Sequence, residues 1–366
     1  MEGQWIGSLE GEVPGFVVLD LDDRGDRYTG VAIFRPLEQG VPSTIAYIDT
    51  LTKAGRYELT AQIGPIDDVT KQPMDMDALA HSYPNVLHDR VAAVTMEPHG
   101  DELHVSYRTS VSSAAGMLRQ FKVEPISSYQ ADETLTWETF KARISLLDPR
   151  HYVYRGQSSP WSLRTSFHRN ARFDLVRYTI EDIAHVQREI LPHTSLFFDR
   201  SSPLLLAGLY NLAQHHGFPT PLLDWTYSPY VAAFFAFRRS STRNAESNEN
   251  VRLFAFNREN WPKPANGMAY LTYVEPHITF LDLPPVENKR ALPQQALAMV
   301  TNINNIEHYI KHQENTSGRR TMTVIDIPYA ERERAMRDLR TMGITAASMF
   351  PGLDGTFEEL KHRLFE

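Results

Sequence analysis

The residues of this chain whose types and spacing could carry chemistry are concentrated in one stretch, 215–237, which reads HHGFPTPLLDWTYSPYVAAFFAF. Asp224 lies alone among apolar residues, and Thr226 and Ser228 follow it before Pro229 opens an apolar helix. Serine followed by proline is typical of a helix start, and helix N-termini favour anionic ligands. We therefore expect part of a ligand site here, with Ser228 capping the helix and Thr226 free to face a ligand.

A second candidate group surrounds Arg155, which lies in the alternating segment 151–156 just before Gly156. Arginine suits the recognition of phosphates and carboxylates. Asp224 is flanked by Leu223 and Trp225 and is expected to face inward, where it needs a partner. Asp224 therefore either braces the fold, for instance by pairing with Arg155, or takes part in catalysis. The bases near Arg155 in the sequence are Lys141, Arg143, Arg150, Arg164, Arg169, Arg172 and Arg177.

Several familiar sites are absent from the sequence. It has no P-loop, dinucleotide-binding glycine fingerprint, nucleophile elbow or zinc-protease motif, and it has no cysteine, which excludes disulfides and thiolate chemistry. His215 and His216 are adjacent on an expected helix end and diverge too far to share a metal easily. Asp20, Asp22 and Gly25 lack the remaining ligands of a calcium loop, so a solvated hairpin turn is expected there. The sequence predicts no metal site.

The length and the charge distribution favour two domains. Residues 1–125 carry 19 Asp and Glu against 10 Lys and Arg, a net charge of −9, whereas residues 126–366 carry 26 against 27, a net charge of +1. The first part reads as short strands separated by turns, which predicts a small antiparallel β-barrel or sandwich with a short helix at 74–80. No apolar run is long enough to cross a membrane and no secretory signal is evident, so a cytoplasmic location is expected.

Helices and strands alternate in the second part, which predicts an α+β fold rather than a doubly wound sheet. The expected helices are 137–147, a longer amphipathic helix over 176–190, 202–216, 228–237, 304–313 and 330–342. The expected strands are 151–156, 251–256, 269–274, 277–283 and 321–327, with a short turn or strand at 222–227.

The two candidate groups together resemble the FRG domain, a family named for its aromatic-Arg-Gly strand. The resemblance rests on Tyr154-Arg155-Gly156-Gln157 and on the run from His216 through Pro219-Thr220, Leu222, Asp224-Trp225-Thr226 and Ser228-Pro229. Near the C-terminus, Gly343-Ile344 and the run from Ser348 to Gly355 look like the closing motif of the family. The resemblance spans about 135–366, so we expect a β-rich accessory or sensor domain at 1–125 and an FRG domain at 135–366.

The FRG domain is in turn similar to ADP-ribosyltransferases of the Arg–Ser–Glu class. This similarity implies an ADP-ribosyltransferase-like fold that binds NAD as its substrate. It assigns the first catalytic position to Arg155 and the second to Thr226 and Ser228. It places the third near Arg290, at Gln294 or Gln295. Gly156, Gln157, His216 and Arg290 are then expected beside NAD, together with Arg155, Thr226 and Ser228.

Two functions follow from this resemblance. In the first, the protein transfers ADP-ribose to a protein or nucleic-acid acceptor, or cleaves NAD, as a toxin or phage-defence effector whose N-terminal domain senses a protein trigger. Glutamine supplies neither charge nor a proton acceptor, so Asp224 or Glu287 would then have to assist Gln294. In the second, the domain binds a nucleotide or protein without turnover.

Overall fold

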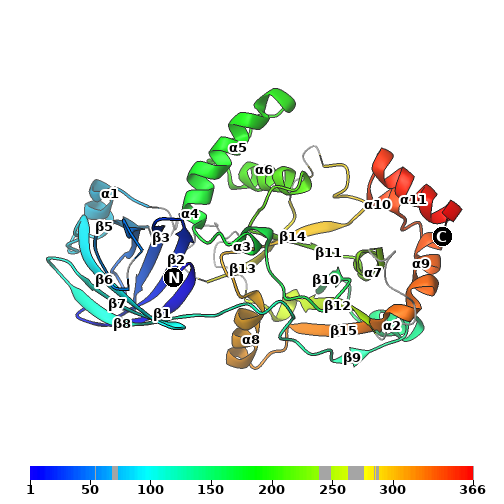
Figure 1. Cartoon of the computed structure of the whole chain (residues 1–366), viewed down its shortest axis with the longest axis horizontal. Helices are drawn as coiled ribbons and strands as arrows, with labels where there is room; N and C mark the ends of the chain where they lie inside the picture. The colour runs from blue at the N-terminus through cyan, green and yellow to red at the C-terminus, as the bar shows by residue number, and fades with distance from the viewer. Residues whose placement is uncertain are drawn as a thin grey trace.

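The computed structural model describes residues 1–53, 55–67, 73–238, 249–262, 276–283, 285 and 288–365. An N-terminal β-barrel and a mixed α/β domain lie side by side along the long axis of the molecule, and the C-terminus lies at the end away from the barrel (Figure 1). Among the helices that the structure describes, none combines the length and the apolarity that crossing a membrane requires.

Eight antiparallel strands close the barrel, because β1 pairs with β2 on one side and with β8 on the other. Along each strand alternate side chains point inward, and Trp5, Leu19, Leu103 and Leu118 are almost completely buried there. The short helix α1 (Met76–Ser82) begins after Asp75, whose carboxylate accepts a hydrogen bond from the Ala78 N–H. The strands are β1 Gly3–Gly11, β2 Gly15–Asp23, β3 Tyr28–Pro36, β4 Ser43–Asp49, β5 Tyr57–Ile66, β6 Val91–His99, β7 Glu102–Arg108 and β8 Ser113–Gln120. Of the two expected folds, the barrel is confirmed.

The second domain is built on a seven-stranded sheet of order β13-β14-β11-β10-β12-β15-β9. Its strand pairs are antiparallel except that of β15 with β9. The strands are β9 Glu133–Thr134, β10 Tyr152–Gln157, β11 Leu222–Thr226, β12 Asn250–Asn257, β13 Ile278–Leu281, β14 Ala296–Thr301 and β15 Met322–Pro328. The expected strand at 269–274 lies outside the described residues.

Helices cover both faces of this sheet. α7 (Pro229–Arg238) packs on one face with α2 (Trp137–Ile144) and α9 (Arg332–Thr341), whereas α8 (Ile306–Ser317) packs on the other. The expected helix over 176–190 is interrupted, because a π-helical turn at Tyr178–Asp182 separates α4 from α5. The remaining helices are α3 Ser166–Arg169, α4 Leu175–Arg177, α5 Ile183–Ile190, α6 Pro203–His215, α10 Ala346–Met349 and α11 Leu353–Phe365, with 3-10 turns at Leu191–His193, Arg258–Asn260 and Tyr329–Glu331.

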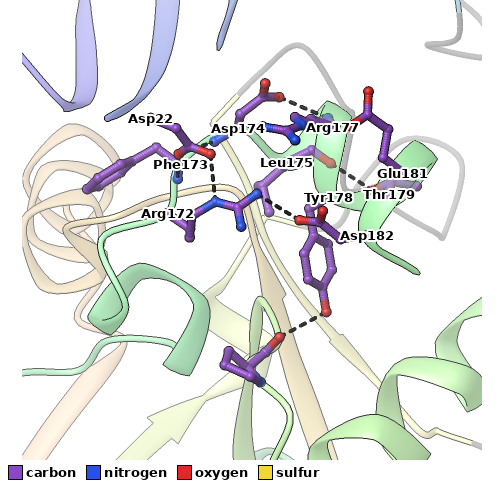
Figure 2. Close-up of polar contacts among 11 residues, drawn as sticks. Asp22, Arg172, Phe173, Asp174, Leu175, Arg177, Tyr178, Thr179, Glu181 and Asp182 are labelled. Carbon is purple, nitrogen blue, oxygen red and sulfur yellow. Dashed lines mark hydrogen bonds and ion pairs between the residues drawn. The ribbon is translucent and has the colours of Figure 1, made fainter. Parts of the chain in front are cut away.

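A buried polar joint connects the two domains (Figure 2). Asp22 lies on β2 and is 1% exposed. Its carboxylate accepts hydrogen bonds from the backbone N–H groups of Phe173 (2.6 Å) and Asp174 (3.2 Å) and forms an ion pair with Arg172 Nε (2.6 Å). Arg172 also donates to Asp182 at 2.7 Å. The expectation of a solvated hairpin turn is confirmed for residues 23–26, which are exposed. It is wrong for Asp20 and Asp22, whose carboxyls are buried because this part of β2 docks on the second domain.

Two further contacts complete the joint. Gln4 donates to the Asn302 carbonyl at 2.6 Å and accepts from the Asn304 N–H at 3.0 Å. On the outer face of the barrel, Val31 and Ile33 belong to one buried apolar cluster with Val176 of α4. Because polar and apolar contacts are both buried, the barrel and the second domain form one continuous structure.

The joint makes stability depend on pH through Asp174. Burial, aided by the charge of Asp22, raises the pKa of Asp174 to about 6, from 3.8. The folded state then binds more protons than the unfolded state between about pH 4 and 6, so this contribution to the free energy of unfolding falls as pH rises through that window. We expect Asp174→Asn to gain stability relative to wild type between pH 4.5 and 7, by up to about 3 kcal/mol. Urea unfolding of both proteins at pH 4.5 and at pH 7 measures this gain, with Asp26→Asn, in an exposed turn, as the control. If Asp174→Asn and wild type differed in free energy of unfolding by the same amount at both pH values, the raised pKa of Asp174 would be contradicted.

Candidate functional site

Arg155 lies where two strands of the second domain separate. β10 pairs with β12 along its whole length but with β11 at one position, Tyr154 opposite Thr226. Beyond that position Arg155 Nη1 donates to the main-chain carbonyl of Asp224 at 2.6 Å. Its buried Nε atom has no hydrogen-bond partner among the described residues. Burial lowers the pKa of Arg155 to about 10, which leaves the guanidinium charged at neutral pH and partly desolvated.

Asp224 lies beside Arg155, and each side chain affects the pKa of the other. The residue is exposed to solvent, yet burial by protein on its other sides raises the pKa of its carboxyl, against the lowering effects of Arg155 and Gln214. Gln214 of α6 donates to this carboxylate and accepts in turn from the Thr220 hydroxyl. The expected inward orientation of Asp224 is wrong. In a strand its buried neighbours Leu223 and Trp225 point to the opposite face of the sheet.

Two further arginines extend this basic group, because Arg169 lies near Arg155 and Arg164 lies near Arg169. Arg169 Nη1 donates to the Arg164 carbonyl at 2.6 Å, and Arg164 Nε donates to Asn304 Oδ1 at 2.9 Å. Its charge lowers the pKa of Arg155 and of Arg164, in each case after the larger effect of burial, and it acts on Asp224 as well. In the described part of the chain no carboxylate lies within ion-pair distance of these three side chains. The other bases of the predicted cluster are ion-paired with nearby carboxylates: Lys141, Arg143, Arg150, Arg172 and Arg177.

The hydroxyls of Thr226 and Ser228 are used within the protein. Thr226 Oγ1 donates to the Gln294 carbonyl at 2.8 Å and accepts from the Ser228 N–H at 3.0 Å. Ser228 Oγ accepts from the Val231 N–H at 3.2 Å, as a helix cap does. Thr226 is 5% exposed, so the expectation that its hydroxyl is free to face a ligand is wrong. Both residues position the end of β11 and the start of α7.

The predicted third position lies on the turn before β14, next to Thr226. Gln294 Nε2 donates to the Met349 carbonyl at 2.8 Å, which fixes its amide against α10. The guanidinium of Arg290 lies 5.1 Å from the ring centre of Phe350. Glu287 lies outside the described residues.

The remaining predicted contacts have local structural roles. Gln157 Nε2 donates to the Trp161 carbonyl at 3.0 Å, and His216, at the end of α6, is exposed. Gly156 is explained by packing, because a Cβ atom there would lie 1.8 Å from the Ala232 carbonyl oxygen of α7. The glycine after Arg155 therefore allows strand and helix to approach each other.

The surroundings of Asp224 also depend on residues that we did not single out from the sequence. Gln214 contacts Asp224 directly, and Ser166 accepts from the Thr220 N–H at 2.9 Å while donating to its carbonyl at 3.1 Å. Thr220 lies within the family-like run around Asp224, which was the available signal for it. Among the described residues, no three His, Asp or Glu side chains gather as a metal site would require.

The fold and this site define a two-domain protein in which a mixed α/β domain carries a group of arginines next to one carboxylate. Residues 150–245 match the family model of the FRG domain, so the chain contains an FRG domain. The match includes Arg155, Arg164, Arg169, Gln214 and Asp224 and ends before Gln294 and the C-terminal motif. No curated protein and no solved structure matched the chain.

Proposed function

We propose that the second domain is ADP-ribosyltransferase-like and that it binds NAD at the group formed by Arg155, Arg164, Arg169 and Asp224. The observation that carries this proposal is the group of three arginines, which lack ion-pair partners among the described residues. A dinucleotide pyrophosphate supplies the anionic oxygens that such guanidinium groups bind in pairs. The resemblance of the FRG domain to ADP-ribosyltransferases selects NAD among the possible dinucleotides.

In this proposal Asp224 is the carboxylate that assists cleavage of NAD. When the bond between ribose C1′ and the nicotinamide nitrogen breaks, its electron pair goes to the nitrogen and positive charge develops at C1′. An ionised Asp224 stabilises that charge and accepts the proton that water or an acceptor loses when it bonds to C1′. The protein would then act as an effector, for example of a toxin or phage-defence system, on an acceptor in the cytoplasm.

A second candidate function, binding without turnover, is favoured by the state of the other predicted catalytic groups. Thr226, Ser228 and the Gln294 amide all bond to protein atoms. A domain whose charged groups at this site, among the described residues, are arginines and Asp224 could hold a nucleotide or an anionic protein segment as a signal. The two candidates share the arginines and differ in the need for Asp224.

Cleavage of NAD separates these candidates. We expect wild type to release nicotinamide from labelled NAD, with or without label transfer to cell lysate, and Asp224→Asn to lower the rate at least about 100-fold, as loss of a general base does. Asp199→Asn, at an exposed turn, controls for the loss of one carboxylate. Binding of NAD without release in wild type would establish the second candidate, and neither binding nor release would reject both.

A further inference from the structure

The N-terminal barrel is filled at one end and hollow at the other. Trp5, Leu21, Tyr57 and Leu103 point inward and are at most 6% exposed, so they close one end. Towards the other end lies a cavity of about 420 Å³ that opens to solvent. Its size falls in the range of sites that hold small molecules, roughly 300–1,000 Å³.

Small inward-facing residues leave this space empty. Ala32, Ala46 and Ala92 line the cavity on β3, β4 and β6, at positions where larger side chains would fill an eight-stranded barrel. Phe34 and Val105 point inward as well but remain partly exposed. Apolar side chains that face the inside of a barrel and are still accessible mark an incompletely filled core, which a ligand would complete.

The few polar groups at the mouth are uncharged apart from one carboxylate. His88 bonds to the Thr44 hydroxyl at 3.0 Å and to the Asp89 carbonyl at 2.6 Å, and burial lowers its pKa, so the imidazole is neutral at pH 7. Burial raises the pKa of Tyr107, which keeps its phenol protonated. Among the described residues that line the cavity there is no lysine or arginine, and the Asp89 carboxylate is held by Ser110 (2.6 and 2.8 Å). An anionic ligand would find no counter-charge among them.

We propose that the barrel binds a small, uncharged and largely apolar molecule whose one hydrogen-bonding group lies near His88 and Tyr107 at the mouth. This site is separate from the proposed NAD site at Arg155. It gives the accessory domain a small-molecule ligand in addition to any protein trigger. Because the barrel docks on the second domain through Asp22 and Gln4, a bound ligand would stabilise the face that contacts that domain.

Displacement of an uncharged fluorescent probe tests this site. The full chain is titrated with N-phenyl-1-naphthylamine, and bound probe is then displaced with 1-dodecanol or with dodecanoate, which has the same chain length and an anionic head. We expect saturable binding of one probe per chain and displacement by the alcohol at a concentration at least 10-fold lower than by the carboxylate. Ala46→Phe, which fills the cavity, is expected to lower probe affinity at least 10-fold. Ala93→Phe, on the exposed outer side of β6, is expected to leave it unchanged.

Several results would overturn the proposal. The site is rejected by the absence of saturable binding, by equal affinity in Ala46→Phe and wild type, or by equal loss in Ala93→Phe. Equal displacement by the carboxylate rejects the uncharged class of ligand. Circular dichroism establishes that each variant is folded, and Ala92→Phe replaces Ala46→Phe if the latter does not fold. Addition of NAD does not displace the probe if the two sites are separate.

Discussion

Replacing Asp22 with alanine is expected to lower the free energy of unfolding by about 3–5 kcal/mol, the cost of removing one partner of a buried ion pair. The carboxylate accepts the Phe173 and Asp174 N–H groups and the Arg172 guanidinium at the joint. Its removal leaves two buried N–H groups without an acceptor. It also removes one of the two carboxylates that bind Arg172, which keeps its bond to Asp182. Urea unfolding measures the loss, and separate transitions of the barrel and the second domain would be a further sign of a broken joint.

Asp26→Ala is the matched control for this experiment. Asp26 follows in the same hairpin, but its side chain is 71% exposed, so its removal is expected to change stability by at most about 0.5 kcal/mol. If Asp22→Ala were as mild as this control, the joint would not be the main connection between the domains.

Gly156→Ala is expected to have the second-largest effect, a loss of about 3 kcal/mol, at the upper end for overpacking. The added Cβ would lie 1.8 Å from the Ala232 carbonyl oxygen and 3.1 Å from the Ala236 Cβ. Both neighbours belong to α7, so β10 and the helix must move apart. Because Arg155 precedes this glycine, the same variant is expected to weaken the binding of NAD at the proposed site.

Thermal or urea unfolding of Gly156→Ala, compared with Gly55→Ala, checks this expectation. Gly55 has open space where a Cβ would be, so the control is expected to stay within about 0.5 kcal/mol of wild type. If Gly156→Ala were as stable as wild type, α7 could move away from β10 without loss of free energy of unfolding. The packing explanation of this glycine would then be wrong.

The sequence was sufficient for the elements with regular patterns and insufficient for contacts between distant segments. The caps and prolines predicted α6 and α7, and alternation predicted most barrel strands. β6 and β8 have no such signal, because Ala92 and Ala93 in β6 and Ala114 and Ala115 in β8 carry little strand preference, and Pro98 interrupts the pattern of β6. The joint at Asp22 connects residues about 150 positions apart, which no local pattern reveals.

At the site, Arg155 and Asp224 were found from the sequence, but their geometry was not. Apolar residues on both sides of Asp224 suggested an inward orientation. In a strand, however, the alternation of Leu223, Asp224 and Trp225 implies that the carboxyl faces away from its apolar neighbours. The hydroxyl of Thr226 was assigned to a ligand because the turn before β14, whose Gln294 carbonyl accepts its hydrogen bond, was not expected beside it. Arg164 and Arg169 were visible as bases, but the ion pair of Arg172 with Asp22, which sets Arg172 apart from them, is a tertiary property.

The most direct test of the proposed NAD site at Arg155 is calorimetric titration of the full chain with NAD, compared between wild type, Arg155→Ala and Arg150→Ala. One or two charge-assisted hydrogen bonds lost with Arg155 correspond to roughly 10- to 100-fold weaker binding, whereas Arg150 is exposed and paired with Asp148. We expect saturable binding by wild type and by Arg150→Ala, with Arg155→Ala weakened by that factor. NAD at about 100 times its dissociation constant should also stabilise wild type by about 2.7 kcal/mol. No binding of NAD by wild type, or equal affinity of Arg155→Ala and wild type, would contradict the assignment of the NAD site to Arg155.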